Sequence, residues 1–225
     1  MRFDAMKKIL SSVLMMAFIA GSSVPAVAAE PKMGAEFDKT AQIIPTESGN
    51  KIEVVEVFWY GCIHCYQMDP TLDAWVKKLP ADVVFKRMPG LPQPSWEPMA
   101  KTFYVMEDLK VFDRLHSKLF DAIHAKNGNK KIAIDEKEAM QWVAKESGLD
   151  IAKVEAAYNS FSMKSRLART AQYFRASGAT GVPSLVIDGR FLTSSTMAGN
   201  NEAALKTADY IIANIRNDKA KAAKK

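Results

Sequence analysis

The sequence predicts an α/β fold in which a small sheet is interrupted by a block of helices and then completed by a hairpin and a last helix. Three observations support this prediction. Two segments rich in β-branched residues, 51–60 and 82–88, flank a helix-length segment. Apolar residues then recur with helical spacing from residue 94 to about residue 178. Strand-like segments return after Gly178, and an amphipathic segment follows them.

Residues 1–29 are predicted to be a secretory signal peptide that takes no part in the fold. Arg2, Lys7 and Lys8 precede an apolar run, and AVAAE offers small residues for cleavage after Ala28 or Ala29. The alternative is an uncleaved membrane anchor, but the apolar run ILSSVLMMAFIAG is short for a membrane span. We therefore expect an exported protein, in a compartment where disulfides form and persist.

The rest of the chain has the size and charge of an ordinary globular domain. Removing the leader leaves 196 residues, which is enough for one domain with a substantial core. The net charge of the whole chain is +6, but the leader contributes +2 and the C-terminal tail KAKAAKK contributes +4. We interpret this tail as a solvated, disordered end. Because no aromatic residue alternates with its lysines, we expect no nucleic-acid partner.

The first predicted elements form a β-α-β unit. Residues 51–60, KIEVVEVFWY, are mostly apolar on both faces from Val54 onward, which is typical of a central strand that is covered on both sides. A helix is expected to begin at the cysteine motif that follows and to end near Leu79. The next strand is DVVFKRM, residues 82–88. This order implies parallel pairing through a right-handed crossover.

Residues 92–178 are predicted to be a helical insertion between residues 30–91 and 179–225. Asp135 with Glu138 resembles a helix-capping box, and Gly148 is typical of a helix end. The apolar stripes predict an ordinary helical core, as in the four-residue repeat of Val111, Leu115, Leu119 and Ile123. After the insertion, SLVID and RFLT flank the hairpin dipeptide Asp188–Gly189, and an amphipathic helix over about 201–217 closes the fold.

The two cysteines of the chain, Cys62 and Cys65, lie in the stretch FWYGCIHCYQMDP. A bond between cysteines this close constrains the unfolded chain little, so the pair predicts chemistry rather than a structural crosslink. Cys62 falls at the start of a helix, where backbone N–H groups and the helix dipole stabilise an anion and lower a thiol pKa. Cys65 lies one turn further in and is expected to be more buried. Cys62 is therefore predicted to be the attackable sulfur and Cys65 the resolving one.

A zinc half-site is the alternative interpretation of the CxxC motif. Structural zinc usually needs four ligands, and the sequence has no second CxxC. His116 and His124 have no partner cysteines and are interpreted as surface or core-edge residues. The sequence also has no flavin or nicotinamide motif. We therefore expect no metal and no cofactor, with the dithiol itself as the redox group.

Two polar residues near the motif are predicted to tune it. His64 is placed to donate to the Cys62 thiolate or to add positive charge, and the alternative is a solvent-facing polar residue. Glu56 interrupts the apolar strand, and a buried carboxylate needs a partner or a proton. Lys86 in the next strand is the expected partner of Glu56, and Arg87 is the alternative. The alternative is a solvated position at the edge of the sheet, where Glu56 would need neither a partner nor a proton.

These motifs together resemble the DsbA family of periplasmic thiol:disulfide interchange proteins. FWYGCIHCYQ is similar to the family's active site, GATGVPSLVIDGRF to its loop and hairpin, and AAYNSFSMKSRLA to its late helices. The resemblance covers essentially the whole chain after the leader and implies a thioredoxin fold with an inserted helical domain. The sequence departs from the family at Ile63–His64, where members often carry Pro-His. This difference bears on the redox potential and not on the fold.

The resemblance also implies roles for individual residues. An acid and a lysine at the positions of Glu56 and Lys86 lie beneath the disulfide in thioredoxin-like proteins, which suggests proton handling at Cys65. Val182–Pro183 is expected to be a cis-proline that packs against the cysteines and leaves backbone polar groups of Val182 free for a client chain. The alternative for Val182–Pro183 is a plain turn.

The predicted function is that of an exported dithiol oxidase, which donates the Cys62–Cys65 disulfide to reduced, unfolded secreted proteins. The resemblance implies a periplasmic location and reoxidation by a membrane quinone-linked protein of the DsbB type. We expect a monomer. Two other functions stay open: a disulfide isomerase or reductase of the same fold, and an exported binding protein or chaperone in which the CxxC motif is incidental.

Overall fold

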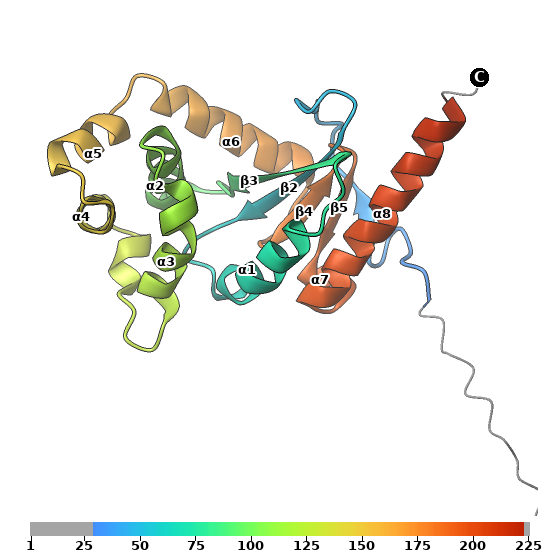
Figure 1. Cartoon of the computed structure of the whole chain (residues 1–225), viewed down its shortest axis with the longest axis horizontal. Coiled ribbons are helices and arrows are strands. Elements are labelled where there is room, and N and C mark those ends of the chain that lie inside the picture. Colours follow the sequence, from blue (N-terminus) through green and yellow to red (C-terminus); the bar gives the residue numbers. More distant parts are fainter. Residues whose placement is uncertain (1–28, 223–225) are drawn as a thin grey trace, which may run out of the picture.

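A mixed five-stranded sheet with the order β1-β5-β4-β2-β3 lies beside a block of helices in the computed structural model (Figure 1). The structure describes residues 29–222. Apart from Ala29, the predicted signal peptide lies outside the described residues. Within residues 29–222, no helix is both long enough and apolar enough to cross a membrane.

The predicted β-α-β unit is confirmed. It consists of β2 (Ile52–Phe58), α1 (Ile63–Val76) and β3 (Val83–Pro89). β2 and β3 are parallel, and Glu56 lies directly opposite Arg87 in their register. Every residue of β2 is buried, because the strand lies between β3 and β4 and is covered on both faces. The apolar character of its sequence follows from that position.

The predicted hairpin is also confirmed. β4 (Ser184–Ile187) and β5 (Phe191–Ser194) pair antiparallel. Asp188 and Gly189 at the turn have φ angles of 53° and 63°, the left-handed region that a tight hairpin turn requires. The structure adds a short edge strand that the sequence did not predict, β1 (Phe37–Lys39), which pairs with β5. Three residues are too few to display an alternating pattern.

The helical insertion is confirmed between β3 and β4. Asp135 caps one of its helices by accepting from the backbone N–H groups of Lys137 and Glu138, and Gly148 ends that helix with φ 74°. The four residues of the predicted apolar stripe are all buried. The insertion contains two short 3-10 turns and five helices: Pro94–Trp96, α2 (Glu97–Asp108), α3 (Phe112–His124), Lys130–Ala133, α4 (Glu136–Ser147), α5 (Ile151–Tyr158) and α6 (Met163–Ser177).

Helices cover both faces of the sheet. Met68 and Leu72 of α1 pack with α8 (Asn201–Ala222) on one face. Phe174, near the end of α6, packs against Val55 and Val57 of β2 on the other face. A single turn, α7 (Ser195–Ala198), connects β5 to α8. This arrangement places the start of α1 at the end of the sheet nearest the helical insertion (Figure 1).

The last helix is longer than the sequence predicted. α8 continues to Ala222, so the expectation of a disordered tail is wrong for residues 219–222. Lys219 donates to the carbonyl of Asn50 at 3.2 Å and lies 3.8 Å from the Asp188 carboxylate. These contacts with loops at the end of the sheet support the additional turn of helix.

Candidate active site

Cys62 occupies the N-cap position of α1. Its backbone N–H donates to the carbonyl of Trp59, and its carbonyl accepts from the N–H of Tyr66, so the residue joins the strand-to-helix loop to the first helical turn. The thiol is partly exposed and is not bonded to Cys65 in this structure. The helix-start position predicted for Cys62 is confirmed.

The surroundings of Cys62 favour its thiolate. The Cys65 thiol, as hydrogen-bond donor, is the largest influence that lowers the pKa of Cys62 from 9.0 to about 6. Partial burial acts in the opposite direction. The backbone N–H groups of Cys65 and His64 and the charge of His64 lower the pKa further. At neutral pH the Cys62 sulfur is therefore largely ionised when reduced.

Cys65 is the opposite case. Its side chain is fully buried, and burial raises its pKa well above 9.0. The neighbouring Cys62 and Glu56 raise the pKa of Cys65 further, because each carries negative charge when ionised. Cys65 is thus protonated when reduced, and it must gain a proton whenever it leaves a disulfide.

The loop before β4 closes one side of the site. The Val182–Pro183 peptide bond is cis, as the resemblance implied. The Cys62 sulfur lies 3.4 Å from the carbonyl oxygen of Val182, which accepts from the thiol when Cys62 is protonated. Val182 and Pro183 also line a pocket of about 390 Å³, together with His64, Ser195 and Asn200. The cysteines therefore lie next to a polar depression that is open to a second molecule.

Glu56 is buried but is not paired with Lys86, so that prediction is wrong. Its side chain is 2 % exposed, and its carboxylate accepts from Arg87 Nε at 3.0 Å. Side chains alternate between the two faces of a sheet, and the register places Arg87 on the face of Glu56 and Lys86 on the face of Val55. Burial raises the pKa of Glu56 from 4.5 to about 7, although Arg87 opposes the increase.

Lys86 belongs to a second ion pair on the opposite face. Its ammonium lies 2.7 Å from the carboxylate of Glu53 and 3.6 Å from that of Glu47. Glu53 is buried and also accepts from the hydroxyl of Ser48. Lys86 is therefore not part of the site around Cys65.

The histidines divide into three different environments. His64 is exposed at the start of α1, beside Cys62. His124 is half-buried, interacts with the backbone carbonyl of Tyr60 through Nε2 at 2.7 Å and stacks on Tyr66. His116 is 4 % exposed and interacts with Tyr60 and Asp69, so its assignment to the surface or the edge of the core is wrong. The rings of Phe58, Phe112 and Phe120 surround it.

The comparisons with known proteins agree on one family. A family model for a DSBA-like thioredoxin domain matches residues 91–206. The thiol:disulfide interchange protein DsbA of Pseudomonas aeruginosa is 38 % identical over 204 residues, which cover 91 % of this chain and 94 % of that protein. The Azotobacter vinelandii DsbA is 36 % identical over 211 residues, covering 90 % and 97 %. The chain belongs to the DsbA family.

Solved DsbA structures have the same architecture. The crystal structure of Pseudomonas aeruginosa DsbA has a TM-score of 0.76 at 37 % identity and covers 87 % of this chain and 97 % of its own. The oxidoreductase DsbA from Xylella fastidiosa has a TM-score of 0.76 at 27 % identity, with coverages of 84 % and 100 %. As a DsbA-family member, the chain is a thiol:disulfide oxidoreductase with a thioredoxin fold and a helical insertion, and its partners are substrate proteins.

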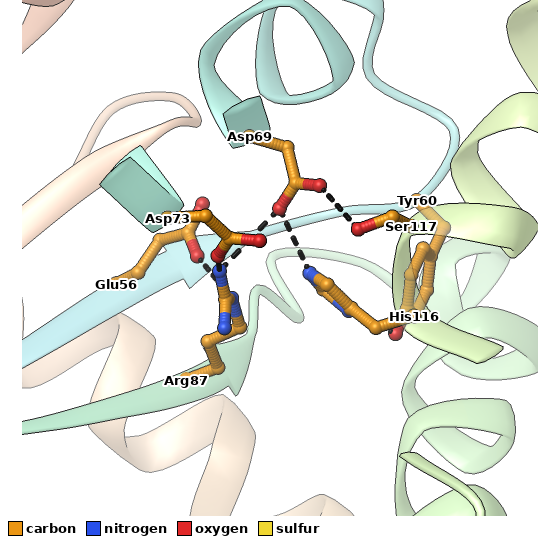
Figure 2. Close-up of polar contacts among 7 residues, drawn as sticks. All are labelled: Glu56, Tyr60, Asp69, Asp73, Arg87, His116 and Ser117. Carbon is orange, nitrogen blue, oxygen red and sulfur yellow. Dashed lines mark hydrogen bonds and ion pairs between the residues drawn. The ribbon is translucent and has the colours of Figure 1, made fainter. Parts of the chain in front are cut away.

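Two acidic residues of α1 that lie near Glu56 in this DsbA-family protein were not predicted from the sequence. Asp69 and Asp73 follow Cys65 at intervals of four residues, so all three lie on one face of the helix. Arg87 donates to Asp73 at 2.5 Å and to Asp69 at 3.4 Å (Figure 2). The i, i+4 spacing from Cys65 was the signal present in the sequence. It indicates a polar network only when the buried Arg87 is known to face these two acids.

Proposed function

We propose that the Cys62–Cys65 disulfide is passed to reduced, unfolded proteins that have been exported from the cytoplasm. The observation that supports this direction is the opposite effect of the site on its two thiols. The pKa of Cys62 is lowered to about 6, whereas the pKa of Cys65 is raised well above 9.0. A thiol that is stable as the thiolate is a good leaving group, which favours the reduced enzyme as a product.

The proposed reaction has two exchange steps. A client thiolate attacks the Cys62 sulfur of the Cys62–Cys65 disulfide, forms a client–Cys62 bond and releases Cys65 as a thiolate. Cys65 then takes a proton. A second client thiolate attacks the client sulfur of the mixed disulfide, forms the client disulfide and releases the Cys62 thiolate. Two electrons pass from the client to the enzyme in total.

Four residues receive proposed roles around this reaction. Glu56 supplies the proton to the departing Cys65, because its pKa of about 7 suits a group that gives and takes protons near neutrality. His64 stabilises the Cys62 thiolate by its charge and its backbone N–H. Val182 and Pro183 form the wall along which the client chain lies, which the 3.4 Å contact from Cys62 to the Val182 carbonyl supports. Lys86 has no role in this proposal.

We also propose the setting in which the enzyme works. Residues 1–29 act as an export signal to the periplasm, and the mature protein acts as a monomer. Residues 30–91 and 179–225 form the thioredoxin-like domain around the helical insertion at 92–178. Since each turnover leaves two thiols, an oxidant is required, and we propose a membrane quinone-linked protein of the DsbB type.

Replacing each cysteine with alanine separates this function from the alternatives. Cys62→Ala should abolish disulfide exchange with a reduced client peptide, while client binding remains. Cys65→Ala should keep Cys62 reactive and accumulate a client–Cys62 mixed disulfide, visible by non-reducing electrophoresis. If Cys62→Ala and the wild type exchanged at the same rate, the CxxC motif would be incidental, and the function would be that of a chaperone or binding protein. Faster scrambled-disulfide repair than dithiol oxidation in the wild type would indicate an isomerase.

A further inference from the structure

A network of polar side chains, largely buried except at Asp73 and Ser117, connects the sheet to the helical insertion (Figure 2). Arg87 Nε lies 3.0 Å from Glu56, and Arg87 Nη2 contacts both acids of α1. Asp69 Oδ1 lies 3.1 Å from His116 Nε2 on α3, and Asp69 Oδ2 accepts from the Ser117 hydroxyl at 2.8 Å. His116 Nδ1 lies 2.7 Å from the Tyr60 hydroxyl. The network therefore extends from Glu56, whose charge raises the pKa of Cys65, to a histidine of the insertion.

The charges of this network do not cancel. Glu56, Asp69 and Asp73 are three carboxyl groups around the single guanidinium of Arg87. Glu107 of α2 and Asp113 of α3 line the same pocket as Arg87 and add no positive charge. Lys86 also lines it, but its ammonium is paired with Glu53 and Glu47 on the other face of the sheet. Because uncompensated buried charge is costly, the network favours retention of a proton. Burial combined with the charges of Asp69 and Asp73 makes Glu56 the carboxyl group that holds it, with a pKa of about 7.

His116 determines how much of Arg87 remains available to Glu56. An ionised carboxylate only accepts hydrogen bonds, so the proton on His116 lies on Nε2 and points to Asp69. Nδ1 then accepts from the Tyr60 hydroxyl. This neutral tautomer agrees with burial, which lowers the pKa of His116 even though the Asp69 carboxylate opposes the decrease. With His116 and Ser117 both donating to it, Asp69 makes only a long 3.4 Å contact to Arg87, and Arg87 stays on Glu56.

We propose that His116 is a positioning residue for disulfide exchange, which keeps Arg87 on Glu56 by satisfying Asp69 and so sets the pH at which Glu56 exchanges its proton with Cys65. This inference rests on the proposed role of Glu56. Without the donor on His116, Asp69 draws the guanidinium away from Glu56, and the Glu56 carboxylate loses its compensating charge. Proton release from Glu56 then requires a higher pH.

The test replaces His116 with residues that differ in one hydrogen bond. His116→Phe keeps a ring among Phe58, Phe112 and Phe120 but has no donor, whereas His116→Gln keeps an N–H near the Nε2 position. The titration midpoint of Glu56, followed by carbon NMR of the labelled side-chain carboxyl in the intact protein, should increase by about one pH unit in His116→Phe. It should return close to the wild-type value in His116→Gln.

Two further variants complete the test. Ser117→Ala removes the other donor to Asp69 and should raise the Glu56 midpoint by a smaller amount, so it replaces His116→Phe if that variant does not fold. Tyr60→Phe removes the other partner of His116 without touching Asp69 and should leave the midpoint unchanged. An unchanged or lowered Glu56 midpoint in both His116→Phe and Ser117→Ala would overturn the proposal.

Kinetics distinguishes this coupling from the role of Glu56 itself. The pH profile of single-turnover exchange with a reduced client peptide should move upward with the Glu56 midpoint in His116→Phe, and should lose this dependence in Glu56→Gln. If the NMR midpoint moves but the kinetic profile of Glu56→Gln equals that of the wild type, Glu56 does not handle the proton, and His116 positions Glu56 without affecting exchange. That outcome would overturn both the catalytic role and this inference from it.

Discussion

Cys62 and Cys65 are the same functional group in two environments that move their pKa values in opposite directions. Cys62 caps a helix at the surface, whereas Cys65 is fully buried one turn later. The hydrogen bond between them links the two effects, because the Cys65 thiol is a donor only while it is protonated. Ionisation of Cys62 therefore depends on the proton of Cys65.

This dependence predicts selective labelling. In the native reduced protein iodoacetamide should modify Cys62 and not Cys65, with a rate that rises through about pH 6, the pKa of Cys62. Cys65→Ala should move this midpoint upward, because it removes the largest stabilising contact of the thiolate. His64→Ala should move it upward by less. Tandem mass spectrometry locates the label, and equal modification of both cysteines would contradict the assignment of Cys62 as the reactive sulfur.

Glu56 gives a prediction about stability and pH. Burial raises its pKa from 4.5 to about 7, so the folded protein holds a proton that the unfolded chain releases. The corresponding stabilisation is complete below the unfolded pKa and is lost as pH rises through the folded value. Glu56→Gln cannot ionise. Its free energy of unfolding, relative to that of the wild type, should increase between pH 5 and pH 8 by up to about 3 kcal/mol.

Glu53→Gln is the matched control for this measurement. Glu53 is also buried on β2, but hydrogen bonds from Lys86, from Ser48 and from the backbone N–H of Glu47, with the charge of Lys86, outweigh the effect of its burial and lower its pKa. Its contribution to stability is therefore present above the unfolded pKa. The free energy of unfolding of Glu53→Gln, relative to that of the wild type, should not increase as pH rises. Urea unfolding at several pH values measures both variants. A parallel response of the two would show that Glu56 does not hold a proton in the folded protein.

At the scale of elements, the pairing of β2 with β3 separates two ion pairs that the sequence places side by side. Lys86 and Arg87 are neighbours in the chain, yet alternation directs them to opposite faces of the sheet. Arg87 faces the acids of α1, and its side chain is 13 % exposed. Lys86 faces Glu53 and is 37 % exposed.

Two methionine variants test this difference. Arg87→Met leaves three carboxyl groups without their guanidinium, and loss of one partner of a buried pair costs about 3–5 kcal/mol. Lys86→Met removes a partly exposed ammonium, and the Ser48 hydroxyl and the Glu47 backbone N–H still donate to the buried Glu53 carboxylate, so it should cost less, about 1–2 kcal/mol. Urea unfolding at pH 7 compares them. Equal losses of stability would contradict the register of the two strands as the source of the asymmetry.

The same elements show what could be predicted from the sequence. The order of strands and helices, the hairpin at Asp188–Gly189 and the cap at Asp135 are local patterns, and all of them are confirmed. The partner of Glu56 depends on the register between two strands, which no local pattern fixes. The burial of His116 depends on how α3 packs against the end of β2, which is a long-range contact. The residues of the cysteine motif were thus predictable, and the network behind them was not.

At the scale of the whole molecule, the thiolate makes the stability of the fold depend on redox state. Only the reduced protein carries the Cys62 thiolate, so the contacts of Cys62 with Cys65, the helix N–H groups and His64 stabilise the reduced fold alone. A four-residue crosslink does little to restrict the unfolded oxidised chain. DsbA is the usual example of this effect: its reduced form is stabilised, and this makes it a strong oxidant.

Melting temperatures of the two redox forms test this view. The pKa of Cys62 is lowered from 9.0 to about 6, so the stabilisation is complete above the unfolded value, partial at pH 7, and lost as pH falls through 6. At pH 7 it amounts to about 1 kcal/mol, once screening by the solvent that reaches this partly exposed sulfur is allowed for. For a chain of this size that corresponds to about 2–4 °C in Tm.

The reduced protein should therefore melt above the oxidised protein at pH 7, and the difference in Tm should decrease by about 2–4 °C at pH 5. His64→Ala should reduce the difference at pH 7, because it removes one of the groups that stabilise the thiolate. An oxidised form that melts higher at pH 7, with a difference that does not respond to pH, would mean that the thiolate does not drive the direction of exchange.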